Sequence, residues 1–338
     1  MKRSQQLFVL FGLIISVVFL WLAFRGLQPE KVLESLGQVN LLLLLASAAV
    51  FLLSMITITM RWQLLLNASK RVGLGRLYDL VNVGYMGNNV YPFRSGEVLR
   101  IVLLNRDEHI PLARITTTVL VERVFDGVVM LMFVIVPLMF VDIASPETRA
   151  AAAVAAPIFL IALAVFLLLA SQPRLFTRLS DLIAARLPGK LGRLVTALTG
   201  EVIGGLGGLR SIGGVLSVFL MTTLSWGIQG IVYWMVGLAF GLDVGIPIMI
   251  VVVGVVNLAG LIPASPGQIG VFEFFASRVL MGVGVAEETA LAFAFLVHLV
   301  VWLPPTIHGF VVLVRRGLGF AAIRRARELE AETGSRQG

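Results

Sequence analysis

The sequence lacks cysteine altogether and has few charged residues for its length. Without cysteine the chain forms no disulfide, no thiolate metal site and no thiol nucleophile. Only 14% of the 338 residues are charged and 58% are hydrophobic, with a mean hydropathy of +0.95. Soluble domains have about 25% charged and about 45–50% apolar residues. This composition excludes an ordinary soluble domain and predicts an integral membrane protein with several membrane-spanning helices.

The motifs of common nucleotide-binding and catalytic sites are also missing. The sequence has no Gly-x-x-x-x-Gly-Lys-Ser/Thr loop, no Gly-x-Ser-x-Gly elbow, no His-Glu-x-x-His pair and no acidic cluster spaced for a divalent metal. We therefore do not expect ATP-driven pumping by this chain alone, and we expect no enzymatic activity, cofactor or metal site.

Basic residues outnumber acidic residues and give the chain a net charge of +8. A nucleic-acid partner is not expected, because the basic residues stand in short clusters between apolar runs, as in the cytoplasmic loops of membrane proteins. We expect the cytoplasm to contain Arg61 and the clusters within 2–3, 70–76, 106–114, 174–193 and 315–327. The connections poorer in Lys and Arg are 28–40, 142–149 and 241–245. This asymmetry predicts a multi-pass protein of the plasma (inner) membrane with both termini in the cytoplasm.

Several apolar runs approach or exceed the roughly 20 residues that a helix needs to cross a membrane. The first run exceeds the usual hydrophobic core of a signal peptide and lacks an Ala-x-Ala cleavage pattern, so we expect a retained anchor. The predicted spans are Leu7–Phe24, Leu41–Met60, Ile115–Val141, Ala150–Ala170, Ile212–Phe240 and Thr289–Val314.

Two further apolar stretches, Leu80–Leu104 and Ile246–Val283, are interrupted by asparagine, proline and glycine. The basic loops stay on one side only if each stretch begins and ends on the same side. The first is then re-entrant from the cytoplasm and the second from outside. Irregular backbone at membrane depth is tolerated where protein buries it or where it lines a wet cavity, so a site is expected here. The alternative is that proline and glycine merely punctuate two kinked helices.

The two broken stretches repeat one order of residue types, namely Val-Gly, Asn, Pro, Gly and Glu. The interval from Glu97 to Glu122 also equals the interval from Glu273 to His298. We predict an all-α polytopic fold with about six full spans, two re-entrant broken helices and an inverted-topology repeat, an architecture typical of secondary transporters. The expected transmembrane domain covers 1–320, with repeat halves at about 41–141 and 212–316, an amphipathic cytoplasmic segment at 173–210, and a charged cytoplasmic tail at 321–338.

Arg94, Glu97 and Arg100 lie within two helical turns of the first broken stretch. Two guanidinium groups beside one carboxylate leave a net positive charge, which suits a phosphate diester. A helix restarting after Pro92 would add its N-terminal amides to the same place. The alternative is that the two arginines extend to the cytoplasmic surface with Glu97 as their partner.

The following span opens with Glu122, Arg123 and Asp126, which we expect to form a structural network with Arg94 or Arg100 rather than to contact substrate. In the second stretch, a turn exposes backbone groups ahead of a short helix. The predicted substrate-binding residues are Asn89, Pro92, Arg94, Gly96, Glu97, Arg100, Pro266, Gly267, Gln268, Gly270 and Glu273, and the predicted supporting residues are Glu122, Arg123, Asp126 and His298.

Three segments, Asn89–Arg100, Glu122–Asp126 and Pro263–Glu273, resemble the lysylphosphatidylglycerol synthase transmembrane-domain family, also called the flippase-like family. The resemblance covers about Leu7–Arg316. In bifunctional members this domain moves aminoacylated phosphatidylglycerol between leaflets, and a separate cytosolic domain performs tRNA-dependent aminoacyl transfer. The resemblance implies a standalone member without the aminoacyltransferase domain. Many relatives have Pro-Gly-Gly-Ile-Gly where this chain has Pro266-Gly267-Gln268-Ile269-Gly270. The resemblance therefore does not specify the head group of the lipid.

These observations predict a lipid translocase whose partner is a membrane lipid. The lipid is expected to be an anionic or aminoacylated phospholipid or a polyprenyl-phosphate lipid. The alternatives are an accessory subunit or enzyme acting on lipid-linked sugars, and a non-catalytic membrane scaffold. The sequence does not decide whether the protein forms a homo-oligomer or acts with a pathway partner.

Overall fold

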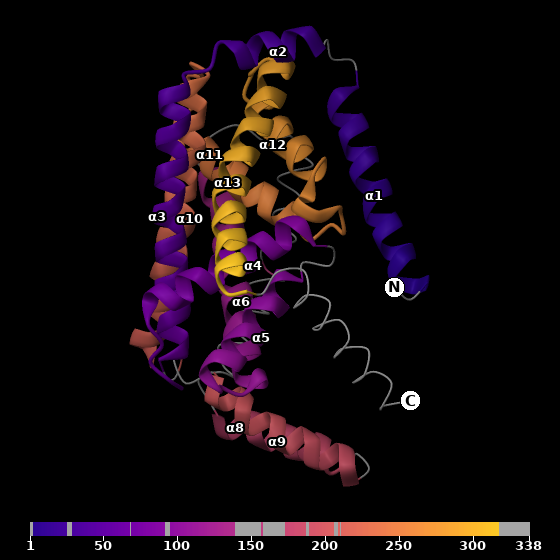
Figure 1. Cartoon of the computed structure of the whole chain (residues 1–338), viewed down its shortest axis with the longest axis vertical. Coiled ribbons are helices and arrows are strands. Elements are labelled where there is room, and N and C mark those ends of the chain that lie inside the picture. Colours follow the sequence, from indigo (N-terminus) through magenta and orange to yellow (C-terminus); the bar gives the residue numbers. More distant parts are fainter. Residues whose placement is uncertain are drawn as a thin grey trace.

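A computed structural model describes residues 3–25, 29–67, 69–91, 95–138, 157, 173–186, 189–205, 209 and 211–317. Every regular element in these ranges is helical, which confirms the predicted all-α membrane fold (Figure 1). The elements are α1 (Arg3–Phe24), α2 (Pro29–Gly37), α3 (Leu41–Leu66), α4 (Leu74–Val90), α5 (Gly96–Glu108), α6 (Leu112–Leu138), α8 (Pro173–Ala184), α9 (Gly189–Gly205), α10 (Ile212–Ala239), α11 (Ile246–Ala259), η3 (Pro266–Gln268), α12 (Val271–Met281) and α13 (Glu287–Arg315).

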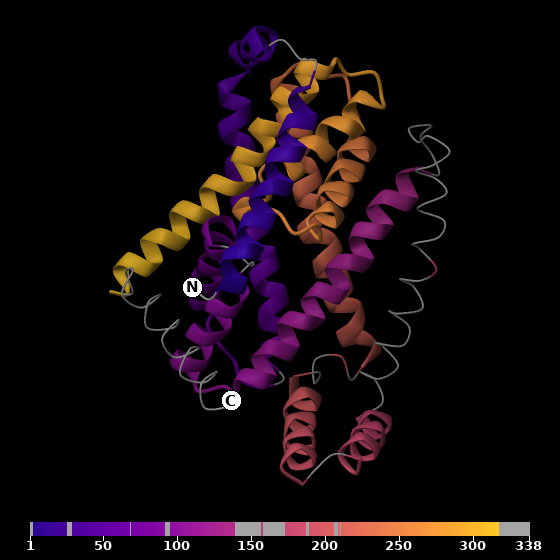
Figure 2. The same ribbon diagram turned by 90° about the vertical axis from the view of Figure 1, so that its right-hand side faces the viewer.

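The long apolar helices α3 and α10 run along the long axis of the molecule, and α13 crosses that axis obliquely (Figures 1 and 2). Each is long and apolar enough to cross a membrane. Leucines in the middle of such helices face outward, including Leu53 at 54% and Leu220 at 62% exposure. Large exposed apolar surfaces are rare on soluble monomers, so these side chains are suited to lipid. The predicted span at 150–170 and the tail at 321–338 lie outside the described residues, apart from Pro157.

Helices α4 and α5 form the first hairpin. The start of α4 and the end of α5 lie next to each other. The Lys70 ammonium, just before α4, lies 2.7 Å from the Glu108 carboxylate at the end of α5. Arg76 pairs with the same carboxylate. The chain therefore leaves and returns at one end of the molecule, which excludes a single kinked span for this stretch.

Glycines allow the two arms of this hairpin to touch. A Cβ atom added to Gly96 would overlap the Gly84 carbonyl oxygen, and one added to Gly87 would overlap the Gly96 Cα. Close helix packing through glycine is a usual device in membrane proteins.

Helices α11 and α12 form the second hairpin at the opposite end of the long axis from α4 and α5 (Figures 1 and 2). The turn of this hairpin contains η3, which contacts α4. Gly267 in this turn lies against the Asn89 carbonyl and the Trp302 indole, where an added Cβ would come within 3.3 Å and 2.9 Å. The two hairpins thus approach from opposite ends and meet at their tips.

Short helices lie across the two ends of the bundle. Helix α2 crosses the end at which α13 begins, where Ser35 and Thr289 hydroxyls are 3.5 Å apart (Figure 1). Helices α8 and α9 form a pair at the other end, joined by a Ser180–Thr199 hydrogen bond (Figure 2). The segment predicted to be amphipathic therefore contains two helices outside the bundle.

Candidate functional site

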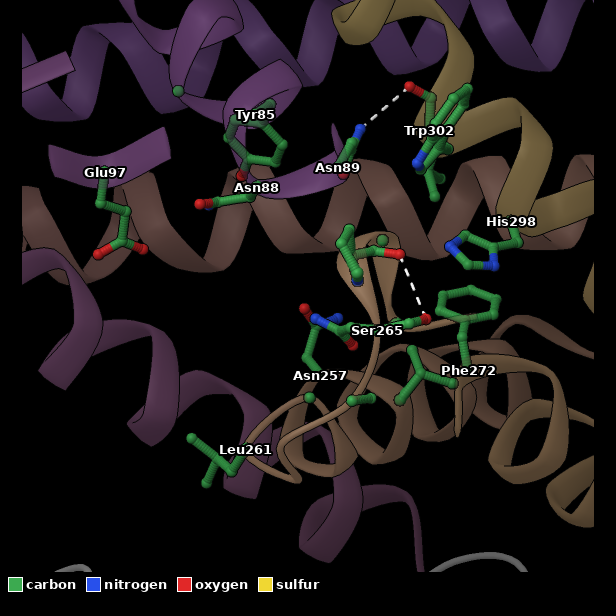
Figure 3. Close-up of a pocket in the computed structure, with 18 of the residues that line it drawn as sticks. Tyr85, Asn88, Asn89, Glu97, Asn257, Leu261, Ser265, Phe272, His298 and Trp302 are labelled. Atoms are coloured by element: carbon green, nitrogen blue, oxygen red, sulfur yellow. Dashed lines mark hydrogen bonds between the residues drawn. The ribbon is translucent and has the colours of Figure 1, made fainter. Parts of the chain in front are cut away.

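A cavity of about 460 Å³ lies where the tips of the two hairpins meet (Figure 3). Its walls come from both hairpins and from α3, α6, α10 and α13. Most of its polar groups are amides and aromatic hydroxyl or indole groups, with a few charged side chains on one side. The polar and aromatic lining residues include Tyr85, Asn88, Asn89, Glu97, Arg100, Arg123, Gln229, Tyr233, Asn257, Gln268, Phe272, His298 and Trp302.

Two asparagines hold the tip of the first hairpin in place. Asn88 Oδ1 accepts a hydrogen bond of 3.1 Å from the Gly96 backbone N–H, which joins the two arms of the hairpin. Asn89 Nδ2 donates to the Trp302 carbonyl at 3.2 Å and to the Thr306 hydroxyl at 2.8 Å. The wall of the cavity is therefore fixed to α13.

The tip of the second hairpin has an unusual backbone. Gly267, Gln268 and Gly270 have φ values of +72°, +60° and +91°. Glycine adopts this region without cost, whereas Gln268 is strained by roughly 1–2 kcal/mol. Ser16 of α1 supports the turn, since its Oγ accepts a 2.9 Å hydrogen bond from the Ser265 N–H. Backbone strain that surrounding contacts maintain is often found at functional sites.

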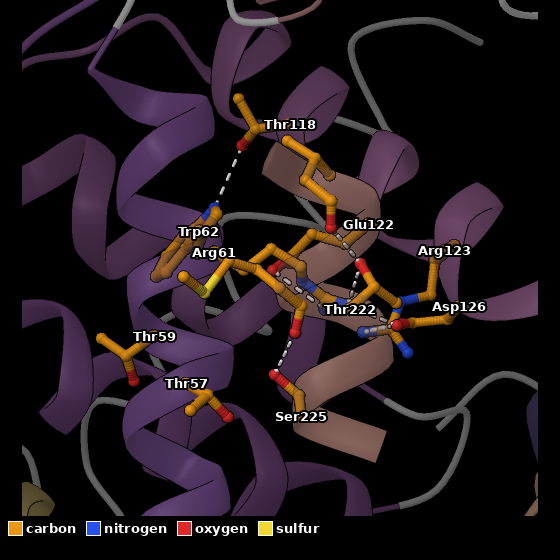
Figure 4. Close-up of polar contacts among 12 residues, drawn as sticks. Thr57, Thr59, Arg61, Trp62, Thr118, Glu122, Arg123, Asp126, Thr222 and Ser225 are labelled. Atoms are coloured by element: carbon orange, nitrogen blue, oxygen red, sulfur yellow. Dashed lines mark hydrogen bonds and ion pairs between the residues drawn. The ribbon is translucent and has the colours of Figure 1, made fainter. Parts of the chain in front are cut away.

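A buried ionic network lies beside the cavity and joins α3, α5 and α6 (Figure 4). Glu122 receives two arginines: Arg100 Nη2 at 2.7 Å and Arg61 Nη2 at 3.2 Å. Asp126 Oδ1 accepts from Arg61 Nη1 at 2.5 Å and from Trp226 Nε1 at 2.7 Å. The side chains of Arg61 and Glu122 are only 1% and 0% exposed, so each charge depends on its partners for stabilisation.

Arg123 extends this network to the cavity. Its Nη2 lies 3.2 Å from Asp126 Oδ2, and its Nε lies 3.5 Å from Glu97 Oε1. The Arg100 guanidinium also stacks over the Trp62 ring, 4.7 Å from its centroid. In the described residues, the arginines of the network and the carboxylates are equal in number. The net positive charge that we expected at Arg94, Glu97 and Arg100 stays a prediction, because Arg94 lies outside the described residues.

The structure overturns the prediction that Arg61 lies in a cytoplasmic loop. Helix α3 continues to Leu66, and Arg61 is enclosed within the bundle. A basic residue at the end of an apolar run normally marks a loop. Here the carboxylates of α6 compensate its burial, and only the fold shows that they face it.

Four buried donors on residues of the cavity walls have no hydrogen-bond partner among the described residues: Arg100 Nε, Arg123 Nε, Gln229 Nε2 and Trp302 Nε1. Buried donors are nearly always satisfied, and these atoms have almost no accessible surface, so a ligand with acceptor oxygens meets them only when their side chains turn toward the cavity. Phosphate oxygens and hydroxyl groups both meet this requirement. Within the described ranges, no three His, Asp or Glu side chains are grouped to hold a metal ion.

The predicted binding residues occupy three kinds of position. Gly96, Gly270 and Glu273 do not line the cavity: the two glycines make close backbone contacts, and Glu273 pairs with His298. Pro92 and Arg94 lie outside the described residues. The cavity lining contains Asn89, Glu97, Arg100, Pro266, Gly267 and Gln268, together with Arg123 and His298 from the predicted supporting group. Their binding roles stay predictions.

Sequence reasoning missed much of the cavity wall. Tyr85, Gln229, Tyr233 and Trp302 were not among the predicted site residues, because each looks like an ordinary residue of a membrane helix. The one usable signal was Gln229, an uncharged polar residue in the middle of an apolar span. Which face of each helix meets the hairpin tips depends on the packing.

Sequence comparison finds relatives over most of the chain. The family described as the lysylphosphatidylglycerol synthase TM region matches residues 9–309. Glycosyltransferase AglD of Haloferax volcanii is 25% identical, covering 88% of this chain and 53% of that protein. A UPF0104 membrane protein of Methanothermobacter thermautotrophicus is 24% identical, covering 83% of this chain and 85% of its own length. A UPF0104 membrane protein of Pyrococcus horikoshii is 19% identical, and the match covers 93% of this chain and 98% of that protein. The chain thus spans about half the length of AglD.

Proposed function

This chain belongs to the family of the lysylphosphatidylglycerol synthase transmembrane region, and from this premise we propose that it moves the head group of a membrane lipid between leaflets. The lipid is an anionic or aminoacylated phospholipid or a polyprenyl-phosphate lipid. The protein acts in the plasma (inner) membrane with both termini in the cytoplasm.

One observation carries the proposal: two hairpins from opposite ends of the molecule meet at a polar cavity. A site between two oppositely oriented elements can open to either side by movement of one element against the other, as in many secondary transporters. A fixed receptor would not need two such elements. The volume of about 460 Å³ is within the usual range for small-molecule sites, so it suits a head group with its acyl or prenyl chains outside.

The open donors of the cavity suit the proposed ligand. Arg100 Nε, Gln229 Nε2 and Trp302 Nε1 come from three different helices, and a turn of each side chain toward the cavity would let these buried atoms donate to phosphate or hydroxyl oxygens. Glu97 adds one carboxylate that suits a cationic group, such as the amine of an aminoacylated lipid. We also propose that Arg94, whose phosphate-binding role was predicted from the sequence, contacts the phosphate.

A second candidate is an enzyme or accessory subunit acting on a lipid-linked sugar. The amide side chains Asn88, Asn257 and Gln229 around the cavity favour it, because amides commonly bind sugar hydroxyl groups, and one relative is named a glycosyltransferase. This candidate predicts a chemically altered lipid, whereas a translocase returns its lipid unchanged.

The test is leaflet exchange of head-group-labelled phosphatidylglycerol in proteoliposomes. We expect wild-type protein to exceed protein-free vesicles, and Glu97→Gln and Gln229→Leu to lower the protein-dependent rate about tenfold or more. Glu34→Gln is the matched control, because this exposed carboxylate of α2 is far from the cavity. Wild-type exchange no faster than empty vesicles would reject phosphatidylglycerol as the lipid, and polyprenyl phosphate would be tested next. Mass spectrometry of the recovered lipid separates transport from chemical conversion.

A further inference from the structure

Glu273 and His298 form a buried acid–base pair at the edge of the cavity. Glu273 Oε1 and His298 Nδ1 are 2.6 Å apart, and the two side chains are only 2% and 12% exposed. A carboxylate and an imidazole at this separation share a proton, and histidine is the side chain whose charge ordinarily changes between about pH 5 and 8.

The histidine ring lies between the cavity and the carboxylate. His298 lines the cavity and Glu273 does not, and the ring is stacked on Phe272 with centroids 4.1 Å apart and an interplanar angle of 18° (Figure 3). With Nδ1 directed at Glu273, Nε2 is the ring nitrogen left to exchange a proton with the cavity that His298 lines.

The surrounding elements leave the pair without another charged partner among the described residues. Helix α11 contributes no titratable side chain, and α10 contributes Tyr233, whose ring centroid is 6.4 Å from that of Phe272. Helix α4 contributes Tyr85, which also lines the cavity, while its Arg76 pairs with Glu108 and its Tyr78 and Asp79 contact His308. The other charged groups of the packed helices are engaged elsewhere or lie toward helix ends. They are Arg278 of α12 over Phe274, Arg61 of α3 in the network with α6, Glu30, Lys31 and Glu34 on α2, Arg25 just after α1 over Trp21, and Glu287, Glu288 and Arg315 at the two ends of α13.

The same carboxylate holds the tip of the second hairpin. Glu273 Oε2 accepts a 2.6 Å hydrogen bond from the Gly270 N–H and so caps α12 directly after the turn that lines the cavity. A hydrogen bond to an ionised carboxylate is roughly twice as strong as one to a neutral acceptor. The strength of this cap therefore depends on where the proton of the pair resides.

We propose that Glu273 and His298 are a proton-binding site that couples proton movement to the lipid movement proposed above. A proton from water on one side binds at His298 Nε2, alters the Gly270 cap, and leaves to water on the other side after the hairpin tip has moved. Only N–H and O–H bonds form and break, and the hydronium ion is the co-substrate. The inference rests on the proposed function for the coupling, whereas the proton site can be tested without lipid transport.

The proton site is tested by NMR of the full-length protein in nanodiscs with isotope-labelled histidine. The sequence contains three histidines, so His298→Gln identifies one ring signal by its loss. We expect the His298 signal to change between pH 5 and 8.5, and Glu273→Gln to alter that change while leaving His109 unaffected. A His298 signal that stays constant over this range would overturn the proton site.

Coupling is tested with labelled phosphatidylglycerol in proteoliposomes under a pH gradient, with the membrane potential held at zero. For one proton per lipid, a gradient of one pH unit is expected to shift the leaflet distribution by up to about tenfold from equality. His298→Gln and Glu273→Gln should give the same distribution with and without the gradient. His109→Asn is the control, because His109 is exposed with φ +57°, which asparagine tolerates, and it should respond as wild type.

The outcomes separate the two proposals. Wild-type exchange that stays equal under the gradient overturns the coupling and leaves the proposed function intact. Absence of exchange without a gradient overturns the transport of this lipid and the coupling with it, while the histidine spectra still decide the proton site. Wild-type exchange with the gradient and without it remains decisive if a variant fails to fold.

Discussion

Glu122 is the residue on which the buried network depends most. It is fully buried and binds Arg61 and Arg100 at once, so it compensates charges from two other helices. Removing one partner of a buried ion pair typically costs about 3–5 kcal/mol, because the remaining charge is left in a low-dielectric place.

We therefore expect Glu122→Gln to lower the free energy of unfolding by about 3–5 kcal/mol. Asp107→Asn is the matched control: Asp107 pairs with Arg316 at 2.7 Å, but both side chains are more than one-fifth exposed. That control should cost about 1 kcal/mol or less. Thermal unfolding in detergent compares the two, and equal losses would contradict the structural role of Glu122.

At the scale of elements, the first hairpin depends on glycine at the contact of its two arms. Gly96→Ala places a methyl group on the Gly84 carbonyl, so α4 and α5 must separate. We expect a loss of about 2 kcal/mol or more, within the range for overpacking, and a lower rate of lipid exchange.

Gly75→Ala is the matched control for this substitution. Gly75 lies near the start of α4 with no atom within 4 Å of an added Cβ. Alanine should stabilise that turn by roughly 0.5–1 kcal/mol, since it loses less backbone entropy than glycine on folding. Opposite signs for the two variants in thermal unfolding support the close contact, and equal signs contradict it.

Glu108 closes the open end of the same hairpin and responds to acid. The hydrogen bond from Lys70, followed by that from Arg76, holds the pKa of Glu108 below its ordinary value. A lowered folded-state pKa gives stability that is present above the unfolded value of about 4.3 and is lost as the pH falls through the folded value.

Wild type should therefore be more stable than Glu108→Gln at pH 7, by about 1 kcal/mol or less per exposed pair. The difference should disappear as the pH falls from about 5 to below the folded pKa. Unfolding midpoints of both proteins across this range provide the measurement. A difference that persists in acid would show that Glu108 acts through packing.

At the scale of the whole molecule, the proposed topology places α2 outside the cell and α8 in the cytoplasm. The two helices lie at opposite ends of the bundle (Figure 1). Because the chain has no cysteine, single cysteines can be introduced without background labelling.

In intact cells, a membrane-impermeant maleimide should label Glu34→Cys of α2 and should label Arg178→Cys of α8 only after permeabilisation. Both positions are exposed. Leu53→Cys, in the outward-facing apolar surface of α3, should stay unlabelled in both conditions because lipid covers it. The reverse pattern for Glu34→Cys and Arg178→Cys would invert the proposed orientation.

The sequence by itself determined the solvent of this protein and the places where its helices break. Its hydrophobic content leaves a bilayer as the only environment that satisfies so much apolar surface, and backbone hydrogen bonding in lipid then requires helices. Asn, Pro and Gly within two apolar stretches marked the hairpins. These are properties of composition and local order along the chain, so no tertiary information was needed.

Only the tertiary structure decided which side chains meet. Arg61 looked like a loop residue until α6 placed two carboxylates beside it, and Arg100 looked like a free phosphate ligand until Glu122 was found 2.7 Å away. The wall formed by Gln229, Tyr233 and Trp302, and the pairing of Glu273 with His298, likewise depend on how separate helices rotate against one another. Burial of a charge is favourable only with its partner in place, and partners far apart in sequence become neighbours only when the helices pack.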